Sequence, residues 1–393
     1  MRQVAFHRPA MGPEEEREVV DTLRSGWITT GPKAKRFEKE FAEYVGARHA
    51  LAVAHCTGAL HLSLWALGFG PGDEVITSPF TFTATAEVMG YLGVKPVFVD
   101  VDPGTFNLSP ARVEEALESG RHRKVKALLP VHFAGHPCDM DRLLAIARQY
   151  NLKMVEDAAH AAGGARHLDG RGMTRVGTIG DLTCFSFYAT KNFTSAEGGM
   201  ITTSDDALAE KIAVASLHGM NRDAWKRYDK SGSWYYEIHD LGFKYNLSDV
   251  HAAIGLAQLR RAPEFMRRRT EIATRYSEAF RACDALQVPF CEAGIEHPWH
   301  LYVLRIKPEL LRVGRGQMVE ILRERGVGTS VHCIPLHTMH YYQRTYGYRN
   351  GDFPVAEDIF NRCFSLPLYA SMSDEDVDYV IENVLAISKE NRR

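Results

Sequence analysis

The sequence predicts an α/β protein with a three-layer large domain, in which helices cover both faces of a mostly parallel sheet, and a smaller α+β C-terminal domain. Two observations carry this prediction. Strand and helix patterns alternate over the first two-thirds of the chain. After residue 247 the pattern changes to long helical segments mixed with a few strands. We therefore place the large domain with an N-terminal arm at residues 1–247, and linking helices with the small domain at 248–393.

The elements of the large domain follow in order. Residues 13–25 and 33–45 are predicted helices, and each is followed by a glycine that ends it. The expected strands cover 49–54, 74–77, 96–101, 125–131, 153–156, 182–187 and 199–203. The helices between the earlier strands cover 58–68, 82–92, 109–119 and 139–151.

The second part of the chain begins with a mostly helical stretch, 247–284. Pro263 is expected to break the helix there or to start a second one, because a proline removes a helical hydrogen bond. Beyond it, strands are predicted at 301–306 and 328–334, and helices at 316–326 and 374–387.

Composition bounds the function. The 393 residues carry a formal net charge of −2, which gives no electrostatic reason to expect nucleic acid or an anionic membrane as partner. The apolar stretches are too short for a transmembrane helix, and the N-terminus lacks the apolar core of a signal peptide. Seven cysteines without a C-x-x-C pair argue against a disulfide framework or a zinc site. We expect a cytoplasmic protein with no metal site.

Ligands of parallel sheets sit beyond the carboxyl ends of the strands, so the residues that follow each strand are the first candidates. Thr57 and Gly58 open a helix whose free N–H groups suit a phosphate, although both are also common helix starters. Asp157 follows an apolar strand, where a carboxylate needs a partner; the alternative is a helix cap. Lys191 follows another strand among aromatic and hydroxyl residues, which favours a desolvated, nucleophilic amine, although a lone lysine is usually solvated.

Together these groups fit the chemistry of pyridoxal 5′-phosphate. That cofactor has a phosphate dianion, a ring nitrogen that must stay protonated and an aldehyde that captures a lysine. A helix start, a strand-end aspartate and a semi-buried lysine supply the three partners. Phe82, just past the strand at 74–77, is a candidate cover for the ring or, equally, a core aromatic. His160 is a lone histidine, a type that is more often structural than functional.

The chain resembles the DegT/DnrJ/EryC1/StrS sugar aminotransferases, a branch of the fold-type I, aspartate-aminotransferase-like enzymes that use pyridoxal phosphate. The resemblance runs almost the whole length. It rests on ordered blocks that include GWITTGPK (26–33), CTGALHLSLWALG (56–68), SPFTFTATAE (78–87), GVKPVFVDVDPGTFN (93–107), ALLPVHFAGHPCDMD (127–141), VEDAAHA (155–161), GDLTCFSFYATKNFTSAEGGM (180–200), GFKYNLSDVHAAIGLAQL (242–259) and GTSVHCIPLH (328–337).

This resemblance implies roles for individual residues. Lys191 matches the lysine that binds the cofactor as a Schiff base, and Asp157 matches the aspartate that pairs with the ring nitrogen. Phe82 matches the aromatic that covers the ring, and His160 stands where the family has His or Gln beside the cofactor. Some relatives carry His in place of the lysine and dehydrate sugars, so the lysine here argues for transamination.

The remaining cofactor contacts are also implied by the resemblance. Thr57, Gly58 and Ser186 match phosphate-binding positions. In GFKYNLSD, Asn246 or Lys244 matches the group that reaches the phosphate in the neighbouring subunit, which implies a homodimer with shared active sites. Many members read N-Y-R here, and the K-Y-N order is similar to the branch that includes the 4-amino-4-deoxy-arabinose aminotransferases.

The implied reaction transfers an amino group from glutamate to a nucleotide-linked keto sugar, at C4 or alternatively at C3. Thr30, His332 and the basic region 260–269 are expected near the nucleotide, although His332 has a structural alternative and Arg267 to Arg269 are favoured as a solvated helix face. Two other functions stay open. One is a glutamine-dependent keto-inositol aminotransferase, and the other is a non-catalytic regulator, which should lack the lysine, the aspartate or the ring cover.

Overall fold

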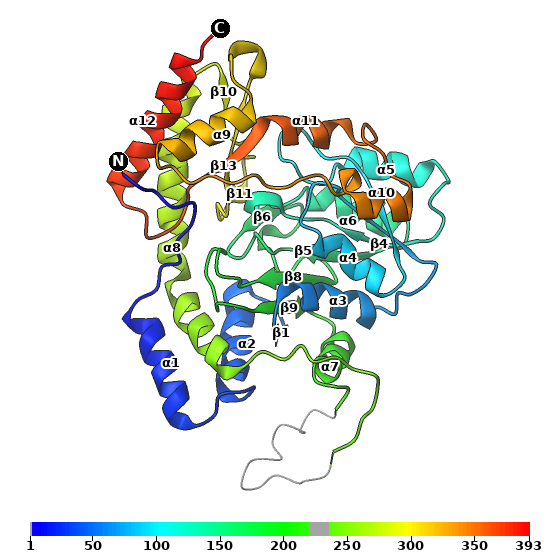
Figure 1. The fold of residues 1–393 in the computed structure, drawn as a ribbon. Helices are drawn as coiled ribbons and strands as arrows, with labels where there is room; N and C mark the ends of the chain where they lie inside the picture. The colour runs from blue at the N-terminus through cyan, green and yellow to red at the C-terminus, as the bar shows by residue number, and fades with distance from the viewer. Residues whose placement is uncertain (1, 221–235) are drawn as a thin grey trace.

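The computed structural model describes residues 2–220 and 236–393. Its main sheet has seven strands in the order β1-β9-β8-β5-β4-β2-β3 (Figure 1). Strands β3, β2, β4, β5 and β8 are parallel, and β9 pairs antiparallel with both β8 and β1. The mostly parallel sheet predicted from the sequence is confirmed. The strands are β1 (His49–Val53), β2 (Glu74–Thr77), β3 (Lys95–Phe98), β4 (Val125–Leu129), β5 (Lys153–Asp157), β8 (Leu182–Ser186) and β9 (Gly199–Thr203).

Helices cover both faces of this sheet because successive residues of a strand point to opposite sides. In β2, Val75 belongs to a core shared with α3, whereas Ile76 belongs to a core shared with α6. Leu129 and Leu128 of β4 divide in the same way. The sheet is therefore the middle of three layers. The covering helices are α3 (Cys56–Ala66), α4 (Ala84–Tyr91), α5 (Pro110–Glu118), α6 (Met140–Gln149) and α7 (Asp206–Ala215).

One long helix, α8 (Asp249–Arg281), runs from α1 (Pro13–Ser25) and α2 (Pro32–Val45) to the C-terminal helix α12 (Asp374–Glu390) (Figure 1). The prediction that Pro263 breaks this helix is wrong, because the helix continues through it. A proline inside a helix costs about 3 kcal/mol. Packing on both sides offsets that cost: Phe265 is buried in a core with α2, and Tyr276 is buried in the C-terminal core.

The C-terminal region has its own antiparallel sheet, β10-β12-β13. The strand predicted at 328–334 does not form. Instead, the N–H of Gly328 donates to the carbonyl of Val4, and Ser330 forms an isolated bridge with Ser365. The backbone of the N-terminal segment thus accepts a hydrogen bond that residues 328–334 would need in order to pair as a strand. The elements of this region are β10 (Leu286–Gln287), β12 (Tyr302–Ile306), β13 (Cys363–Leu366), α9 (Arg315–Glu324), α10 (His340–Tyr346) and α11 (Pro354–Arg362).

A further small sheet, β11-β6-β7, was not predicted from the sequence. Its strands are β6 (Ala165–Leu168), β7 (Gly172–Arg175) and β11 (Ile295–Glu296). Since β6 precedes α8 in the chain and β11 follows it, this sheet joins the parts of the chain on either side of that helix.

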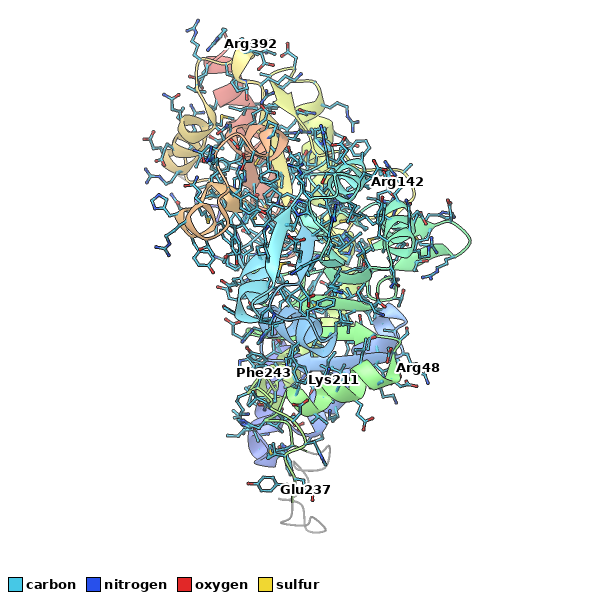
Figure 2. The ribbon with its side chains drawn as sticks, turned by 90° about the vertical axis from the view of Figure 1, so that its right-hand side faces the viewer. Arg48, Arg142, Lys211, Glu237, Phe243 and Arg392 are labelled. Atoms are coloured by element: carbon cyan, nitrogen blue, oxygen red, sulfur yellow. The ribbon has the colours of Figure 1, made fainter. Side chains whose placement is uncertain are left out.

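Most charged side chains lie on the surface. Arg48, Arg142 and Arg392 project from the outside of the ribbon, where each pairs with a nearby carboxylate (Figure 2). Among the described residues, no helix is both long and apolar enough to cross a membrane.

Candidate active site

A cavity of about 430 Å³ opens at the carboxyl ends of the sheet strands. The structure brings seven of the predicted site residues into its lining. They are Thr57, Phe82, Asp157, His160, Ser186, Lys191 and His332. The first six come from the large domain, whereas His332 comes from the C-terminal region.

Lys191 lies in the loop that joins β8 to β9, and its side chain is half-buried. The backbone N–H of Lys191 donates to the carbonyl of Tyr188 at 2.9 Å, and this bond closes a turn just before the lysine. Burial lowers the pKa of the Lys191 amine below its ordinary value. A lowered pKa makes the unprotonated, nucleophilic amine accessible nearer to neutral pH.

Asp157 ends β5 and is 5% exposed. One carboxylate oxygen accepts the hydroxyl of Thr85 at 2.7 Å, and the other accepts the N–H of Ala159 at 3.1 Å. Burial raises the pKa of this carboxyl above its ordinary value. No helix starts after Asp157, so the helix-cap alternative is wrong. A buried carboxylate on the cavity wall instead suits a protonated ring nitrogen, which would repay its desolvation.

Phe82 is 68% exposed and lies on the cavity wall, so it is not a core aromatic. Its ring is free to cover a flat ligand.

His160 also lines the cavity, with its ring 4.3 Å from that of His300. Its Nδ1 is buried and has no hydrogen-bond partner among the described residues. Burial holds the pKa of His160 well below its ordinary value, so the ring is neutral. An unpartnered polar atom at a cavity wall is a place where a ligand can bind.

His332 combines the two alternatives that the sequence left open. Its Nδ1 is 3.0 Å from the hydroxyl of Ser365, and its ring stacks on Phe6, which are structural contacts. It also lines the cavity that contains Lys191. Burial lowers the pKa of His332 to about 4, so this ring is neutral as well.

Two of the three predicted phosphate-binding positions line the cavity, and one does not. Thr57 and Ser186 line the cavity. The N–H of Gly58 instead donates to Nδ1 of His55 at 2.8 Å, and a side chain at Gly58 would meet His55 and Tyr245 at 3.2 Å. The absence of a side chain at Gly58 therefore allows His55 and Tyr245 to lie close to its backbone.

Thr30, Lys244 and Asn246 form a separate group outside the cavity lining. The amide nitrogen of Asn246 donates to the hydroxyl of Thr30 at 2.6 Å, and the Lys244 amine donates to the amide oxygen of Asn246. Lys244 and Asn246, the two candidates for the phosphate contact, therefore form one polar pair.

The basic stretch of α8 is only partly a solvated face. Arg267 is exposed and pairs with Glu271. Arg269, in contrast, is 1% exposed and donates to the carbonyls of Trp299, His300 and Leu368, so the solvated-face interpretation is wrong for this residue. The sequence could not show that this face of α8 turns toward the C-terminal region.

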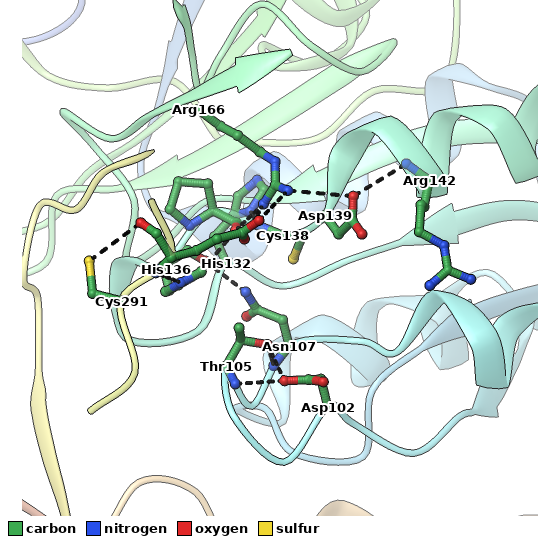
Figure 3. A network of polar contacts seen from close by, with 12 residues as sticks. Asp102, Thr105, Asn107, His132, His136, Cys138, Asp139, Arg142, Arg166 and Cys291 are labelled. Atoms are coloured by element: carbon green, nitrogen blue, oxygen red, sulfur yellow. Dashed lines mark hydrogen bonds and ion pairs between the residues drawn. The ribbon is translucent and has the colours of Figure 1, made fainter. Parts of the chain in front are cut away.

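The loop after β4 forms part of the cavity wall through Val131 and Phe133, and a polar network holds it (Figure 3). The side chain of Asn107 accepts the N–H of Phe133 and donates to the carbonyl of His136, both at 2.9 Å. His132 accepts the N–H of Cys138 at Nδ1, so its Nε2 carries the proton that bonds Glu156 at 2.9 Å. These contacts fix the strand end beside Asp157.

The sequence reasoning missed several residues of the site. Thr85 is buried outside the cavity lining and bonds Asp157, and nothing in the block SPFTFTATAE (78–87) indicated that contact. Unpredicted residues that do line the cavity include His55, Cys56, Tyr188, Glu197, His300 and Cys333. No cluster of three or more His, Cys, Asp or Glu side chains in the described ranges is arranged to hold a metal.

The cavity thus offers a lysine of lowered pKa, a buried carboxylate, an exposed aromatic face and a buried, unpartnered imidazole nitrogen. These groups fit pyridoxal phosphate. Comparison with known proteins decides the matter: residues 9–385 match the model of the DegT/DnrJ/EryC1/StrS aminotransferase family. The chain belongs to this family. It is an aminotransferase, and its cofactor is pyridoxal 5′-phosphate.

Individual relatives cover this aminotransferase end to end. It is 50% identical over 385 residues to the spore coat polysaccharide biosynthesis protein SpsC of Bacillus subtilis, a match that covers 98% of this chain and 97% of SpsC. It is 49% identical, with the same coverage, to the uncharacterized protein MJ1066 of Methanocaldococcus jannaschii.

Among solved structures, a candidate sugar aminotransferase from Streptococcus pneumoniae, Spr1654, superposes in its PMP form with a TM-score of 0.90 at 35% identity, covering 99% of this chain and 100% of its own. Its PLP form gives a TM-score of 0.89. Helicobacter pylori PseC, an aminotransferase involved in pseudoaminic acid biosynthesis, gives 0.88 at 27% identity, with the same coverage as the PMP form.

Proposed function

We propose that this enzyme transfers an amino group from glutamate to the ketone of a nucleotide-linked keto sugar, at C4 of the sugar. The observation that carries the proposal is that Lys191, whose pKa is lowered, the buried Asp157 and the exposed Phe82 all line one cavity. The polysaccharide role in the name of the Bacillus relative and the sugar pathway of PseC support a sugar acceptor.

When bound, pyridoxal phosphate supplies an electron sink and carries the amino group between the two substrates. In our proposal Lys191 binds the cofactor covalently. When it is not bound to the cofactor, its amine would accept the proton from the donor Cα as general base and would deliver it to C4′ of the cofactor as general acid. Asp157 would keep the ring nitrogen protonated, and Phe82 and His160 would help to hold the ring.

Thr57, Gly58 and Ser186 are the proposed phosphate contacts. We further propose that the enzyme is a homodimer in which Asn246 or Lys244 reaches the phosphate in the partner subunit, with Thr30 and His332 near the sugar nucleotide. The location of Asn246 outside the cavity of its own subunit supports this arrangement. The order K-Y-N at 244–246 supports a place near the 4-amino-4-deoxy-arabinose branch.

The visible absorption of the purified, cofactor-loaded enzyme tests the donor first. Addition of glutamate alone should abolish the visible band and release 2-oxoglutarate. A band that responds to glutamine and ignores glutamate would replace the donor and favour the keto-inositol alternative. The aminated enzyme should then regain its band when a nucleotide-linked 4-keto sugar is added, with formation of an amino sugar detected by mass spectrometry. A band that returns only with a keto-inositol would overturn the sugar acceptor.

A further inference from the structure

His300 is an imidazole at the cavity that comes from the C-terminal region and that the proposed function leaves without a role. It is 6% exposed, lines the cavity together with Lys191, and lies with its ring 4.3 Å from that of His160 at an angle of 37°. A ring in this place limits where the His160 ring can move. What holds His300 in place therefore also matters for His160.

The residue that holds His300 is Asn192, the neighbour of Lys191 in the chain. The amide nitrogen of Asn192 donates to the carbonyl of Pro298 at 2.7 Å. Because that carbonyl can only accept, the orientation of the amide is fixed, and its oxygen faces Nδ1 of His300 at 3.1 Å. His300 must then donate from Nδ1, which leaves the lone pair on Nε2. Both side chains are buried, so these bonds do not compete with bulk water.

The charge state of His300 agrees with a single tautomer. Burial lowers the pKa of His300 well below its ordinary value, and the charges of Lys191 and Arg269 act in the same direction. The ring is therefore neutral at neutral pH, as one donor and one acceptor nitrogen require.

Arg269 fixes the same segment from its other side. Its guanidinium donates to the carbonyls of Trp299 and His300 at 3.1 and 3.4 Å, and to that of Leu368 at 3.1 Å. Trp299 has φ +46°, a conformation that a non-glycine residue adopts at some cost. The backbone beside His300 is therefore held by hydrogen bonds on both sides, in a conformation it would not choose alone.

We propose that Asn192 and His300 form a polar clamp that positions Lys191 and the His160 ring for proton transfer. The clamp joins the loop between β8 and β9 to residues 298–300 of the C-terminal region, and this proposal rests on the proposed role of Lys191. This loop spans residues 187–198. Among the hydrogen bonds of the described residues, it bonds residues 298–300 only through Asn192, which is directly next to Lys191. Misplacement of a reacting group by about 1 Å can cost roughly 100-fold in rate, so such a link has a kinetic consequence.

A double-mutant cycle tests the clamp. Asn192→Ala removes the amide, and His300→Phe keeps a ring against His160 but removes the Nδ1 donor. His297→Gln is the matched control. His297 lies next to residues 298–300, where its ring stacks on Trp299 and its Nδ1 accepts the N–H of Trp299 at 2.9 Å, but no contact of it with Asn192 or with the His300 ring occurs among the described residues. Two rates are measured: the appearance of the visible band when apoprotein is mixed with pyridoxal phosphate, and the loss of that band at saturating glutamate. The melting temperature of each apoprotein reports whether the variant folds.

Each single variant of the clamp should slow both rates roughly tenfold, with the half-saturating glutamate concentration unchanged. The double variant should be no slower than the slower single variant, because both changes remove one contact. His297→Gln should combine multiplicatively with Asn192→Ala.

Normal rates in both folded single variants, or multiplicative losses of roughly 100-fold in the double variant, would overturn the clamp while the wild type still responds to glutamate. If one single variant does not fold, normal rates in the other folded single variant would also overturn the clamp. A wild-type enzyme that forms no visible band with the cofactor would instead overturn the proposed role of Lys191, and the clamp with it.

Discussion

The two sides of the cavity are built by different means. The sheet side, Thr57, Phe82, Asp157 and Ser186, consists of residues at or just beyond strand ends, where a parallel sheet always exposes its ligand-binding edge. The C-terminal side, His300, His332 and Cys333, is held by contacts between segments far apart in the chain, such as the bonds from Arg269 to the backbone at 299–300. We therefore expect the sheet side to carry the cofactor chemistry and the C-terminal side to determine how the lysine is held.

The largest expected effect is at Lys191, which both sides enclose. Lys191→Ala should keep the fold and lower turnover by roughly 10⁴-fold, because among the described residues no other lysine lines the cavity to move the proton. The rate at which glutamate abolishes the visible band in a single turnover measures the loss of activity. The circular dichroism spectrum of the variant shows whether it keeps the fold. A folded variant with a near-normal rate would place the chemistry elsewhere.

On the sheet side, Asp157→Asn should slow the glutamate half-reaction roughly 10²- to 10³-fold, since it removes a preorganised charge facing the ring nitrogen. Asparagine is nearly isosteric and can still bond Thr85, so the melting temperature of the apoprotein should change little. Thr85→Val is a useful companion, because it leaves the charge and removes one of its hydrogen bonds. Equal losses in the two variants would mean that Asp157 acts through its position and not through its charge.

On the C-terminal side, the effect should appear in stability. Arg269→Met leaves three backbone carbonyls without their donor and should lower the free energy of unfolding by about 2–4 kcal/mol. Arg267→Met, two residues earlier on the exposed face of α8, is the control and should change it by less than about 0.5 kcal/mol. Urea denaturation of both variants gives the comparison. Equal losses would show that the contacts of Arg269 do not stabilise the fold.

The same contrast explains what could be read from the sequence. The parallel sheet and the positions of Asp157 and Lys191 were predictable because local strand patterns and the geometry of strand ends determine them. The continuity of α8 through Pro263 could not be predicted from the sequence, because it depends on how Phe265 and Tyr276 pack into two separate cores. The failed strand at 328–334 has the same origin: its backbone bonds go to Val4, a residue more than 300 positions away.

A smaller effect is expected at His332, which lines the cavity from the C-terminal side. His332→Ala should raise the KM for the sugar nucleotide roughly tenfold, by removing one hydrogen-bonding ring that lines the cavity. Its effect on the glutamate half-reaction should be smaller, because glutamate does not reach as far as a sugar nucleotide. Steady-state kinetics with each substrate varied in turn separates the two. Ser365→Ala removes only the structural partner of His332, and an equal rise in KM there would assign the effect to positioning.

The smallest expected effect is a shift in a pH profile, and it tests whether both sides together bury Lys191. Its ordinary pKa is 10.5, and burial lowers it. The amine captures the cofactor only when unprotonated, so the capture rate of the apoprotein should rise with pH and level off below 10.5. A free alkylamine in solution gives the reference profile. A variant that opens the C-terminal side, such as His332→Ala, should move the plateau of the enzyme toward that reference, because added water stabilises the ammonium form. A wild-type profile that already coincides with the free amine would show that neither side desolvates the lysine.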